Sequence, residues 1–314
     1  MWRHDAALVS GKLTRVSPGG QPTHRKSLCL GSTQPYEDKE ETMAPQQCWR
    51  YPMEGNAPEL YERYNVPMTF RPLAQLFLEH IGLRAGERVL DVACGTGIVA
   101  RLAAPQVGLS GTVVGLDLNT GMLDVARAQP SESGVTVEWR QGDATALPFA
   151  DAAFDVVCCQ QGLQFFPDKG RALREMYRVL VPGGRLALSI WGVVDPYSAA
   201  MAEALARYVS ADAAARVLAP YALSDAETVR TLVIDAGFRT VDMRTAVLTR
   251  RSIGPPETSI PQGIAGSSYA AAVAAMDPAA RTALVWDISA ALHAYREGEG
   301  FAWPAEAHIV IAQP

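Results

Sequence analysis

One short stretch constrains the fold of this chain more than any other. Residues 89–104 have the sequence VLDVACGTGIVARLAA, in which an apolar strand pattern leads into a glycine loop and then into a helical pattern. This order is typical of the first unit of a doubly wound α/β sheet, where ligands bind beside the glycine loop. Gly95 and Gly97 allow a ligand to approach the backbone closely, so the stretch predicts a binding site at this loop.

The charge beside the loop separates two classes of ligand. Gly95-x-Gly97-x-x-Ala100 fits the dinucleotide fingerprint, and Asp117 follows where a ribose-binding acid would lie. Asp91, however, stands just before the loop, and a carboxylate there repels a pyrophosphate. It attracts a cation instead, such as the sulfonium and ammonium groups of S-adenosylmethionine (SAM). A simple strand-end cap is the structural alternative for Asp91.

Strand and helix patterns alternate along most of the chain, which predicts a doubly wound parallel sheet. The predicted strands are 88–93, 111–118, 135–143, 154–159, 185–191, 240–250 and 307–313. The predicted helices between and before them are 69–82, 97–104, 120–129, 170–180, 199–210 and 224–238. Residues 154–159 form a short continuous apolar run, typical of a strand buried on both faces.

Cap signals mark two later helices. Ser224 and Glu227 form a capping-box pattern, and Gly237 ends the helix that they begin. Asp277 followed by Pro278 is an N-cap with proline in the first helical position. These signals place helices both before the strand at 240–250 and in the long segment after it.

In this order the motifs resemble the class I SAM-dependent methyltransferases, specifically the small-molecule group of the type-11 and ubiquinone/menaquinone kind. The resemblance covers roughly residues 60–192 and rests on Asp91 with its glycine loop, VVGLD, GDATALPF, FDVVCCQQGLQFFPD and RVLVPGGRLALSIW. It implies a Rossmann-like seven-stranded sheet with an antiparallel last strand, and the strands at 240–250 and 307–313 fit the terminal pair. It also implies SAM as the cofactor.

Site residues follow from the resemblance, position by position. The residues expected to bind SAM are Asp91, Ala93, Gly95 and Gly97 at the methionyl end, Asp117 at the ribose, Leu118, Met122, Asp143 and Ala144 at the adenine, and Gln160 beside the sulfur. Ala93 departs from the family, because many relatives have glycine there. Structural alternatives stay open: Asp143 as a turn former, and Gln160 as a partner of loop backbone.

The chain divides into a leader and a catalytic domain. Residues 1–46 are rich in Pro, Gly, Ser and charge without periodicity, which predicts a disordered leader. Residues 57–314 form the predicted methyltransferase domain, with 254–303 as a helical lid or substrate wall inserted between the last two strands. A packing subdomain or a homodimer face is the alternative for this segment.

Composition limits the partners. The net charge of -5 argues against nucleic acid, and no apolar run reaches the roughly 18 residues of a membrane span. Five irregularly spaced cysteines, with Cys158 and Cys159 in a buried run, indicate reduced thiols and a cytoplasmic protein without a metal site. His80 and His308, in apolar surroundings, are expected to be structural.

The predicted reaction is methyl transfer by in-line displacement to a small organic acceptor, such as a quinone precursor, lipid or secondary metabolite. The Ala-, Ile-, Tyr- and Trp-rich lid favours an apolar or aromatic acceptor. No catalytic residue is identified; His293 is a weak general-base candidate, while Tyr61 and Tyr64 either close over the cofactor or pack a helix on the sheet. Two other functions stay open: an NAD-dependent oxidoreductase and a non-catalytic SAM-binding protein.

Overall fold

A computed structural model of the chain describes residues 55–130 and 134–314. The predicted leader, residues 1–46, lies outside these ranges, as do Cys29 and Cys48. Cys94, Cys158 and Cys159 are buried free thiols, as the apolar run around the last two predicts.

The centre of the described domain is a sheet with the strand order β3-β2-β1-β4-β5-β8-β6. Its strands are β1 (Arg88–Val92), β2 (Thr112–Asp117), β3 (Val137–Gln141), β4 (Phe154–Gln160), β5 (Leu180–Trp191), β6 (Thr240–Arg251) and β8 (Gly300–Gln313). The first five strands pair in parallel, whereas β8 is antiparallel to both β5 and β6. The predicted seven-stranded path with an antiparallel last strand is confirmed; a two-residue strand, β7 (Arg296–Glu297), pairs with β8 beside it.

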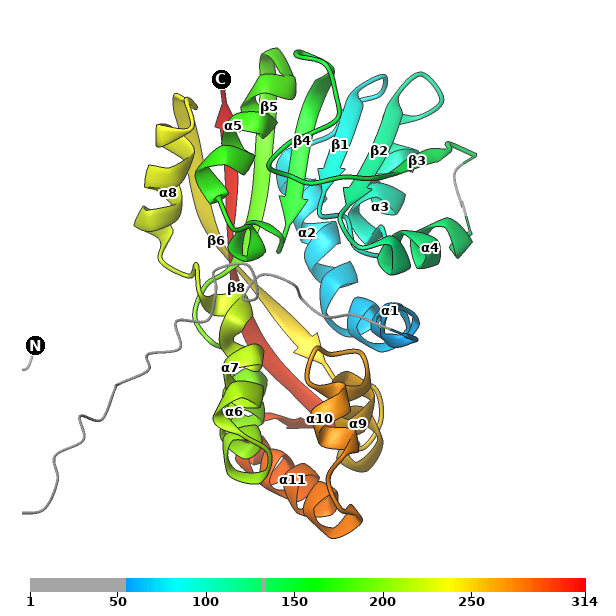
Figure 1. The fold of residues 1–314 in the computed structure, drawn as a ribbon, viewed down its shortest axis with the longest axis vertical. Helices are drawn as coiled ribbons and strands as arrows, with labels where there is room; N and C mark the ends of the chain where they lie inside the picture. The colour runs from blue at the N-terminus through cyan, green and yellow to red at the C-terminus, as the bar shows by residue number, and fades with distance from the viewer. Residues whose placement is uncertain (1–54, 131–133) are drawn as a thin grey trace, which may run out of the picture. The chain divides into compact units, whose positions relative to one another are not determined.

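Helices cover both faces of the sheet (Figure 1). On one face α2 (Arg71–Ile81) and α3 (Ile98–Val107) pack on the strands, with Phe77, Leu78 and Val99 in the core. On the other face lie α5 (Lys169–Val179) and α8 (Ala226–Asp235), which bury Leu173, Met176 and Val233. The helix α4 (Thr120–Ala128) joins β2 to β3. Because both faces are covered, strands such as β4 are apolar along nearly their whole length.

Several predicted boundaries differ from the structure: β5, for example, begins at Leu180 and not at residue 185. Asp225, and not Ser224, caps α8, because the Asp225 carboxylate accepts from the backbone N–H of Thr228 at 2.8 Å. The carbonyl oxygen of Ser224 instead accepts a hydrogen bond from Nε2 of the His308 ring at 3.1 Å. The last strand, β8, begins at Gly300 and not at residue 307, so the end of the predicted lid is strand. The predicted cap Asp277 is confirmed, since it accepts from the N–H of Ala280.

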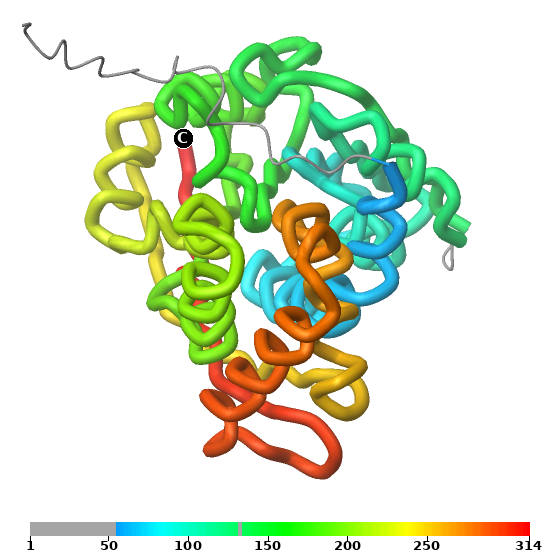
Figure 2. The backbone as a smooth tube through the Cα atoms, turned by 60° about the horizontal axis from the view of Figure 1, so that its bottom comes forward, coloured from blue at the N-terminus to red at the C-terminus, as the bar shows by residue number. Residues whose placement is uncertain are grey.

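A helical lid surrounds the far ends of β6 and β8. It combines α6 (Pro196–Tyr208) and α7 (Ala211–Leu218) with α9 (Pro256–Ala265), α10 (Ala270–Ala274) and α11 (Pro278–Ala291). Figure 2 shows the two groups of helices side by side, and they share one apolar cluster around Trp303. This group of helices, named the lid after its predicted role, therefore comes from two insertions, whereas the prediction included only 254–303. Its role as a lid stays a prediction.

The segment before α2 has an unusual backbone. After α1 (Ala57–Leu60), residues Tyr61–Phe70 form a π-helix, η1, with Pro67 inside it. Proline lacks the N–H that a regular helix requires, so a local change of helical winding relieves the conflict. Such segments are frequent at functional sites, and this one contacts α3, the helix after the glycine loop, through the ion pair of Glu62 with Arg101 at 2.6 Å.

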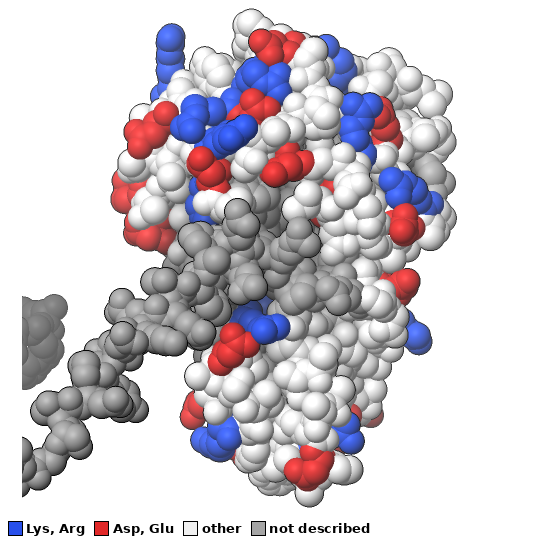
Figure 3. All heavy atoms as spheres, in the orientation of Figure 1, with Lys and Arg blue, Asp and Glu red and all other residues white. Residues whose placement is uncertain are grey.

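The surface shown in Figure 3 carries basic and acidic side chains interspersed, and fewer charges over the lid than over the sheet. Within residues 55–130 and 134–314, no helix has the length and apolarity needed to cross a bilayer. The same residues contain no group of three His, Cys, Asp or Glu side chains arranged to hold a metal ion.

Candidate cofactor and acceptor site

Polar side chains gather at the carboxyl ends of the parallel strands. Asp91 lies on β1 opposite Gly115 of β2 and Cys158 of β4, while Asp117 ends β2 and Gln160 ends β4. Ligands of open α/β sheets bind at this edge. The fold thus brings together residues that lie up to 69 positions apart in the sequence, from Asp91 to Gln160.

The glycine loop between β1 and α3 requires its glycines for two different reasons. Gly95 and Gly97 both have positive φ, at 57° and 86°. A Cβ on Gly97 would lie 2.1 Å from Cη2 of Trp139, so the indole of β3 supports the loop from below. A Cβ on Gly95 would meet nothing within 4 Å, which leaves open space above the loop.

Ala93, which departs from the family pattern, also has a left-handed backbone. Its φ is 57°, a conformation in which glycine carries no steric penalty and alanine does. Gly162 lies against it, since a Cβ on Gly162 would come 2.7 Å from that of Ala93. The position accepts alanine because its neighbour is glycine.

Asp117 holds the loop from the second strand. Its Oδ2 accepts from the N–H of Gly95 at 2.8 Å, and its Oδ1 accepts from the N–H of Asn119 at 2.8 Å. Burial raises the pKa of Asp117, against the effect of these hydrogen bonds. The side chain therefore joins the tips of β1 and β2 at the point where a ribose would lie.

Asp91 is more buried than its predicted role as a carboxylate that attracts a cation supposes. The residue is 1% exposed, and its Oδ2 accepts from the N–H of Ala100 in the first turn of α3 at 3.1 Å. Burial raises the pKa of Asp91 to about 8, and the nearby Asp117 adds to the effect. The predicted alternative was a strand-end cap, whereas this carboxylate accepts from the first turn of α3. A cation beside Asp91 would favour its ionised form at pH 7.

The loop after β3 carries the predicted adenine-binding residues. Asp143 is exposed, and its Oδ1 accepts from the backbone N–H and the hydroxyl of Thr145, both at 2.8 Å. This is the turn-forming role, and it leaves Oδ2 without a hydrogen bond among the described residues. Ala144 and Met122 are buried, whereas Leu118 is 60% exposed.

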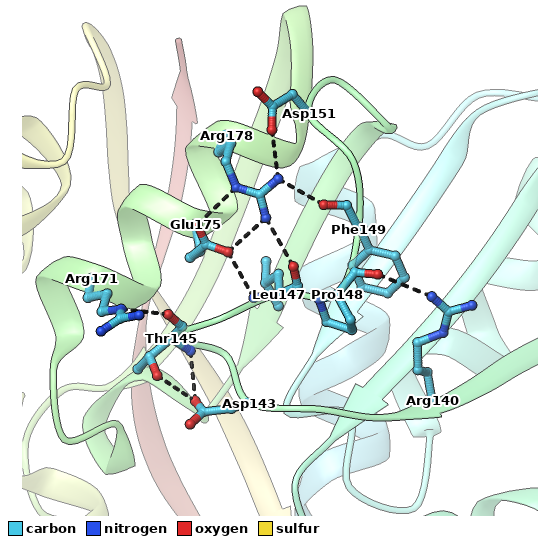
Figure 4. Close-up of polar contacts among 10 residues, drawn as sticks. All are labelled: Arg140, Asp143, Thr145, Leu147, Pro148, Phe149, Asp151, Arg171, Glu175 and Arg178. Carbon is cyan, nitrogen blue, oxygen red and sulfur yellow. Dashed lines mark hydrogen bonds and ion pairs between the residues drawn. The ribbon is translucent and has the colours of Figure 1, made fainter.

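Helix α5 fixes this loop through residues that sequence analysis did not identify (Figure 4). Arg178 donates to the carbonyls of Leu147 and Phe149 at 3.0 and 2.8 Å, and it pairs with Glu175 and Asp151 at 2.7 Å. Glu175 in turn accepts from the N–H of Leu147 at 2.8 Å, and the hydrogen bond from Arg178 lowers the pKa of this carboxyl.

The same helix contributes Arg171, whose Nε donates to the carbonyl of Thr145 at 2.8 Å (Figure 4). Arg171 and Arg178 come from the amphipathic helix pattern GRALREMYRVL. That pattern indicates a polar face, but not what the face contacts.

Gln160 ends β4 and contacts the π-helix η1. Its Nε2 donates to the carbonyl of Phe70 in η1 at 3.4 Å, which fixes the orientation of the amide because a carbonyl cannot donate. Its Oε1 is buried and has no partner among the described residues. The Nε2 of the amide thus satisfies a backbone carbonyl, and its Oε1 can accept a hydrogen bond.

Three aromatic and imidazole candidates have different surroundings. The ring of Tyr61 packs on Phe70 with centroids 5.1 Å apart, and Tyr64 lies beneath the guanidinium of Arg63 at 5.3 Å. Tyr61 also packs against the core cluster between the sheet and α3, which agrees with the alternative of a helix packed on the sheet. His293 lies in η4 (His293–Tyr295) after α11, where it is exposed.

A buried polar network lies on the acceptor side, at the base of the lid. Asp195 caps α6, and its Oδ2 accepts from Arg250 at 2.7 Å, from Tyr221 at 2.5 Å and from Ser198 at 2.9 Å. Arg250 also donates to the Thr69 hydroxyl of η1 at 3.1 Å. Burial opposes the ionisation of Asp195, but the Arg250 guanidinium and the hydroxyl donors prevail and lower its pKa.

Sequence analysis did not find this network. The Asp195-Pro196 pair is the same cap signal as Asp277-Pro278, so the helix start was readable. The charge of Arg250 inside a strand pattern was the only hint of a buried cation, and nothing in the sequence connects it to Asp195 or to Thr69.

Comparisons with known proteins agree with this geometry. A family model described as a methyltransferase domain matches residues 90–188. The ubiquinone/menaquinone biosynthesis C-methyltransferase UbiE of Escherichia coli O1:K1 / APEC is 39% identical over 199 residues, which cover 58% of this chain and 79% of that enzyme. The 2-phytyl-1,4-naphtoquinone methyltransferase of Thermosynechococcus vestitus is 43% identical over 132 residues, or 41% of this chain and 58% of that enzyme.

A solved structure shows the same fold. The crystal structure of the YcgJ protein from Bacillus subtilis aligns with a TM-score of 0.51 at 20% identity, over 76% of this chain and 97% of that one. The fold and the site define a class I SAM-dependent methyltransferase. Within that class the chain belongs to the type-11 family of the UbiE kind, which confirms the predicted resemblance. Family membership favours SAM dependence over the nicotinamide alternative.

Proposed function

We propose that this enzyme transfers the methyl group of SAM to a small, planar, quinone-type acceptor held beneath the lid. The observation that carries the proposal is the junction at Gln160. This residue ends a strand of the cofactor edge and contacts Phe70, whose neighbour Thr69 contacts Arg250 of the lid base. The end of β4 at the cofactor edge is thus linked through η1 to the base of the lid.

The described residues fit SAM at the strand ends. Open space above Gly95 leaves room for a ligand close to the backbone, and the hydroxyl of Thr96 between the two glycines is buried with no partner in residues 55–130 and 134–314. Of the ten predicted residues, Asp91, Ala93, Gly95 and Gly97 would hold the methionyl end and Asp117 the ribose. The adenine would lie among Leu118, Met122, Asp143 and Ala144, with Gln160 beside the sulfur.

Bound SAM would supply an activated methyl group on a sulfonium, so the chain needs mainly to position an acceptor and exclude water. Asp91 would balance the cationic end of the cofactor. Gln160, held by Phe70, would offer its Oε1 to a hydrogen-bond donor of the ligand. Orientation of two reactants contributes up to about 7–11 kcal/mol to a displacement. Rigid placement by the sheet and the lid is therefore the proposed source of catalysis.

The quinone-type acceptor is supported by the lid and by the relatives. The interior of the lid is apolar and aromatic, with Trp303, Tyr197, Phe301 and Met201 buried in one cluster. The curated relatives named above are a naphthoquinone methyltransferase and quinone-biosynthesis C-methyltransferases. A planar apolar ring suits both, and its methylated atom is proposed to be a ring carbon.

The test uses the full chain with methyl-labelled SAM and 1,4-naphthoquinol, a ring with unsubstituted carbons. We expect label on the naphthoquinol and about tenfold weaker SAM binding in Asp117→Ala, because the ribose loses its acceptor. Asp124→Ala is the matched control, since Asp124 is an exposed acid on α4 that pairs only with Arg127. SAM binding without labelled naphthoquinol would disprove the acceptor class, and no SAM binding would disprove the cofactor assignment.

A further inference from the structure

Three polar groups in the core of the lid are buried without hydrogen-bond partners among the described residues. They are the hydroxyl of Tyr197, the hydroxyl of Ser259 and the indole Nε1 of Trp303. The residues are 6%, 6% and 0% exposed. Buried polar groups in folded proteins are nearly always hydrogen-bonded, so three within one apolar cluster require an explanation. Ser198 and Tyr221, nearby in the lid base, are fully paired with Asp195.

The three groups line one region. The rings of Tyr197 and Trp303 are stacked, with centroids 4.9 Å apart and planes at 13°. A Cβ on Gly263 of α9 would lie 2.9 Å from the Tyr197 hydroxyl, so this hydroxyl points at α9. Ser259 lies one turn before Gly263 and therefore on the same face of that helix. The helix α9 thus covers the stacked pair from one side.

The chemistry of these groups selects an oxygen atom as their partner. An indole N–H can only donate, and both hydroxyls can donate. Arg250 adds a cation over Trp303, with its Cζ 5.2 Å from the ring centroid. A ligand atom that satisfies this set must be a lone-pair acceptor, and the aromatic faces around it suit a planar ring.

We propose that Tyr197, Ser259 and Trp303 form a subsite for a carbonyl or phenolic oxygen of the planar ring acceptor. The proposal rests on the proposed function and specifies how the acceptor is oriented. The oxygen anchors the ring within the lid. Because the Cβ position of Gly263 lies 2.9 Å from the hydroxyl of Tyr197, α9 moves aside when the ring enters.

The experiment measures binding of two probes to the full chain with SAM present, by quenching of tryptophan fluorescence. 1,4-Naphthoquinone offers two ring oxygens, and naphthalene is the same ring system without them. We expect the unmodified protein to prefer the quinone by about tenfold or more. In Tyr197→Phe the preference falls severalfold, while the melting temperature holds or rises because an unpaired buried hydroxyl has been removed.

Two further variants test the geometry. Gly263→Ala places a methyl group beside the Tyr197 hydroxyl without removing any polar atom, and it should reduce quinone binding in the same way. Tyr208→Phe is the matched control, because the Tyr208 hydroxyl already donates to Asp287 at 2.9 Å. This variant should keep the preference and lose stability.

Equal binding of both probes by the unmodified protein would overturn the subsite. A Tyr197→Phe variant that keeps the full preference for the quinone and loses stability would also overturn the subsite, because the hydroxyl would then have a structural partner such as water. Methyl transfer from labelled SAM is read in a separate assay. A protein that binds the quinone in this pattern but never methylates a ring disproves the proposed function and leaves the subsite standing.

Discussion

The glycine-loop end of the site and the base of the lid satisfy their buried charges in different ways. Asp91 and Asp117 accept backbone N–H groups 9 and 22 residues away in the sequence. Asp195 and Thr69 receive the Arg250 side chain from 55 and 181 residues away. The cofactor end is thus a local structure that one motif can encode, whereas the lid base exists only after distant segments have assembled.

The largest expected effect is at the glycine loop. Gly97→Ala introduces a left-handed alanine and drives its methyl group into Trp139, so we expect about 3–5 kcal/mol of lost stability in urea unfolding. Gly95→Ala is the matched variant, with a positive φ but open space at Cβ. It should cost about 1–2 kcal/mol and chiefly weaken SAM binding. Equal destabilisation by the two variants would show that Trp139 does not support the loop.

The second prediction concerns the ion pair between Arg250 and Asp195 at the base of the lid. Arg250→Met leaves Asp195 as a buried carboxylate without its cation, and we expect about 3 kcal/mol of destabilisation in the same assay. Because the pKa of Asp195 is lowered in the folded state, its contribution is present above the unfolded pKa and is lost as pH falls through the folded pKa. The loss caused by Arg250→Met should therefore shrink in acid.

The double variant Arg250→Met with Asp195→Asn is the control for this network. Removing both charges should recover part of the lost stability, because no unpaired ion stays buried. A double variant as unstable as the sum of the two single variants would mean that the pair does not interact in solution.

The third prediction concerns the protonation of Asp91 beside the glycine loop. With its pKa raised to about 8, Asp91 is mostly protonated at pH 7, and a cation beside it favours the carboxylate. SAM binding at pH 7 should then release close to one proton, and affinity should rise with pH up to about 8 and level off. Calorimetry in two buffers of different ionisation enthalpy measures the release.

Asp91→Asn removes the charge of the side chain but keeps an oxygen that can accept from α3. Its amide oxygen can still accept from Ala100, but SAM should bind about tenfold more weakly and without proton release. A raised pKa makes the folded protein lose stability as pH rises from about 4 to 8, so this variant should exceed the original protein in stability at pH 9. Unchanged proton release in the variant would assign the titration to another group.

The smallest effect concerns the adenine-side loop. Arg178→Met removes the donor that holds the carbonyls of Leu147 and Phe149, and we expect SAM binding to weaken about fivefold with about 1 kcal/mol of lost stability. Arg244→Met, at an exposed ion pair with Asp242, should change stability by less than about 0.5 kcal/mol and leave SAM binding unchanged. Isothermal titration with SAM distinguishes them.

Much of the sheet could be predicted because its signals are local. Continuous apolar runs predicted β1, β2, β4 and the core of β5, and the glycine loop indicated where a ligand binds. Errors arose at element ends. Asp225 displaced Ser224 as the cap of α8, since a carboxylate at that position reaches the N–H of Thr228. The strand β8 extends back to Gly300 because the long β6 offers it a partner.

The sequence by itself determined the fold class and the place of the glycine loop, because both depend on strand and helix patterns formed by residues close in the sequence. The antiparallel last strand was implied by the resemblance to a family and not by a local pattern. Tertiary structure alone decided what the buried side chains face. It turned Asp91 into a helix cap with a raised pKa, and it joined Arg250 to Asp195 and Thr69. Long-range contacts set burial, and burial sets both hydrogen-bond partners and charge.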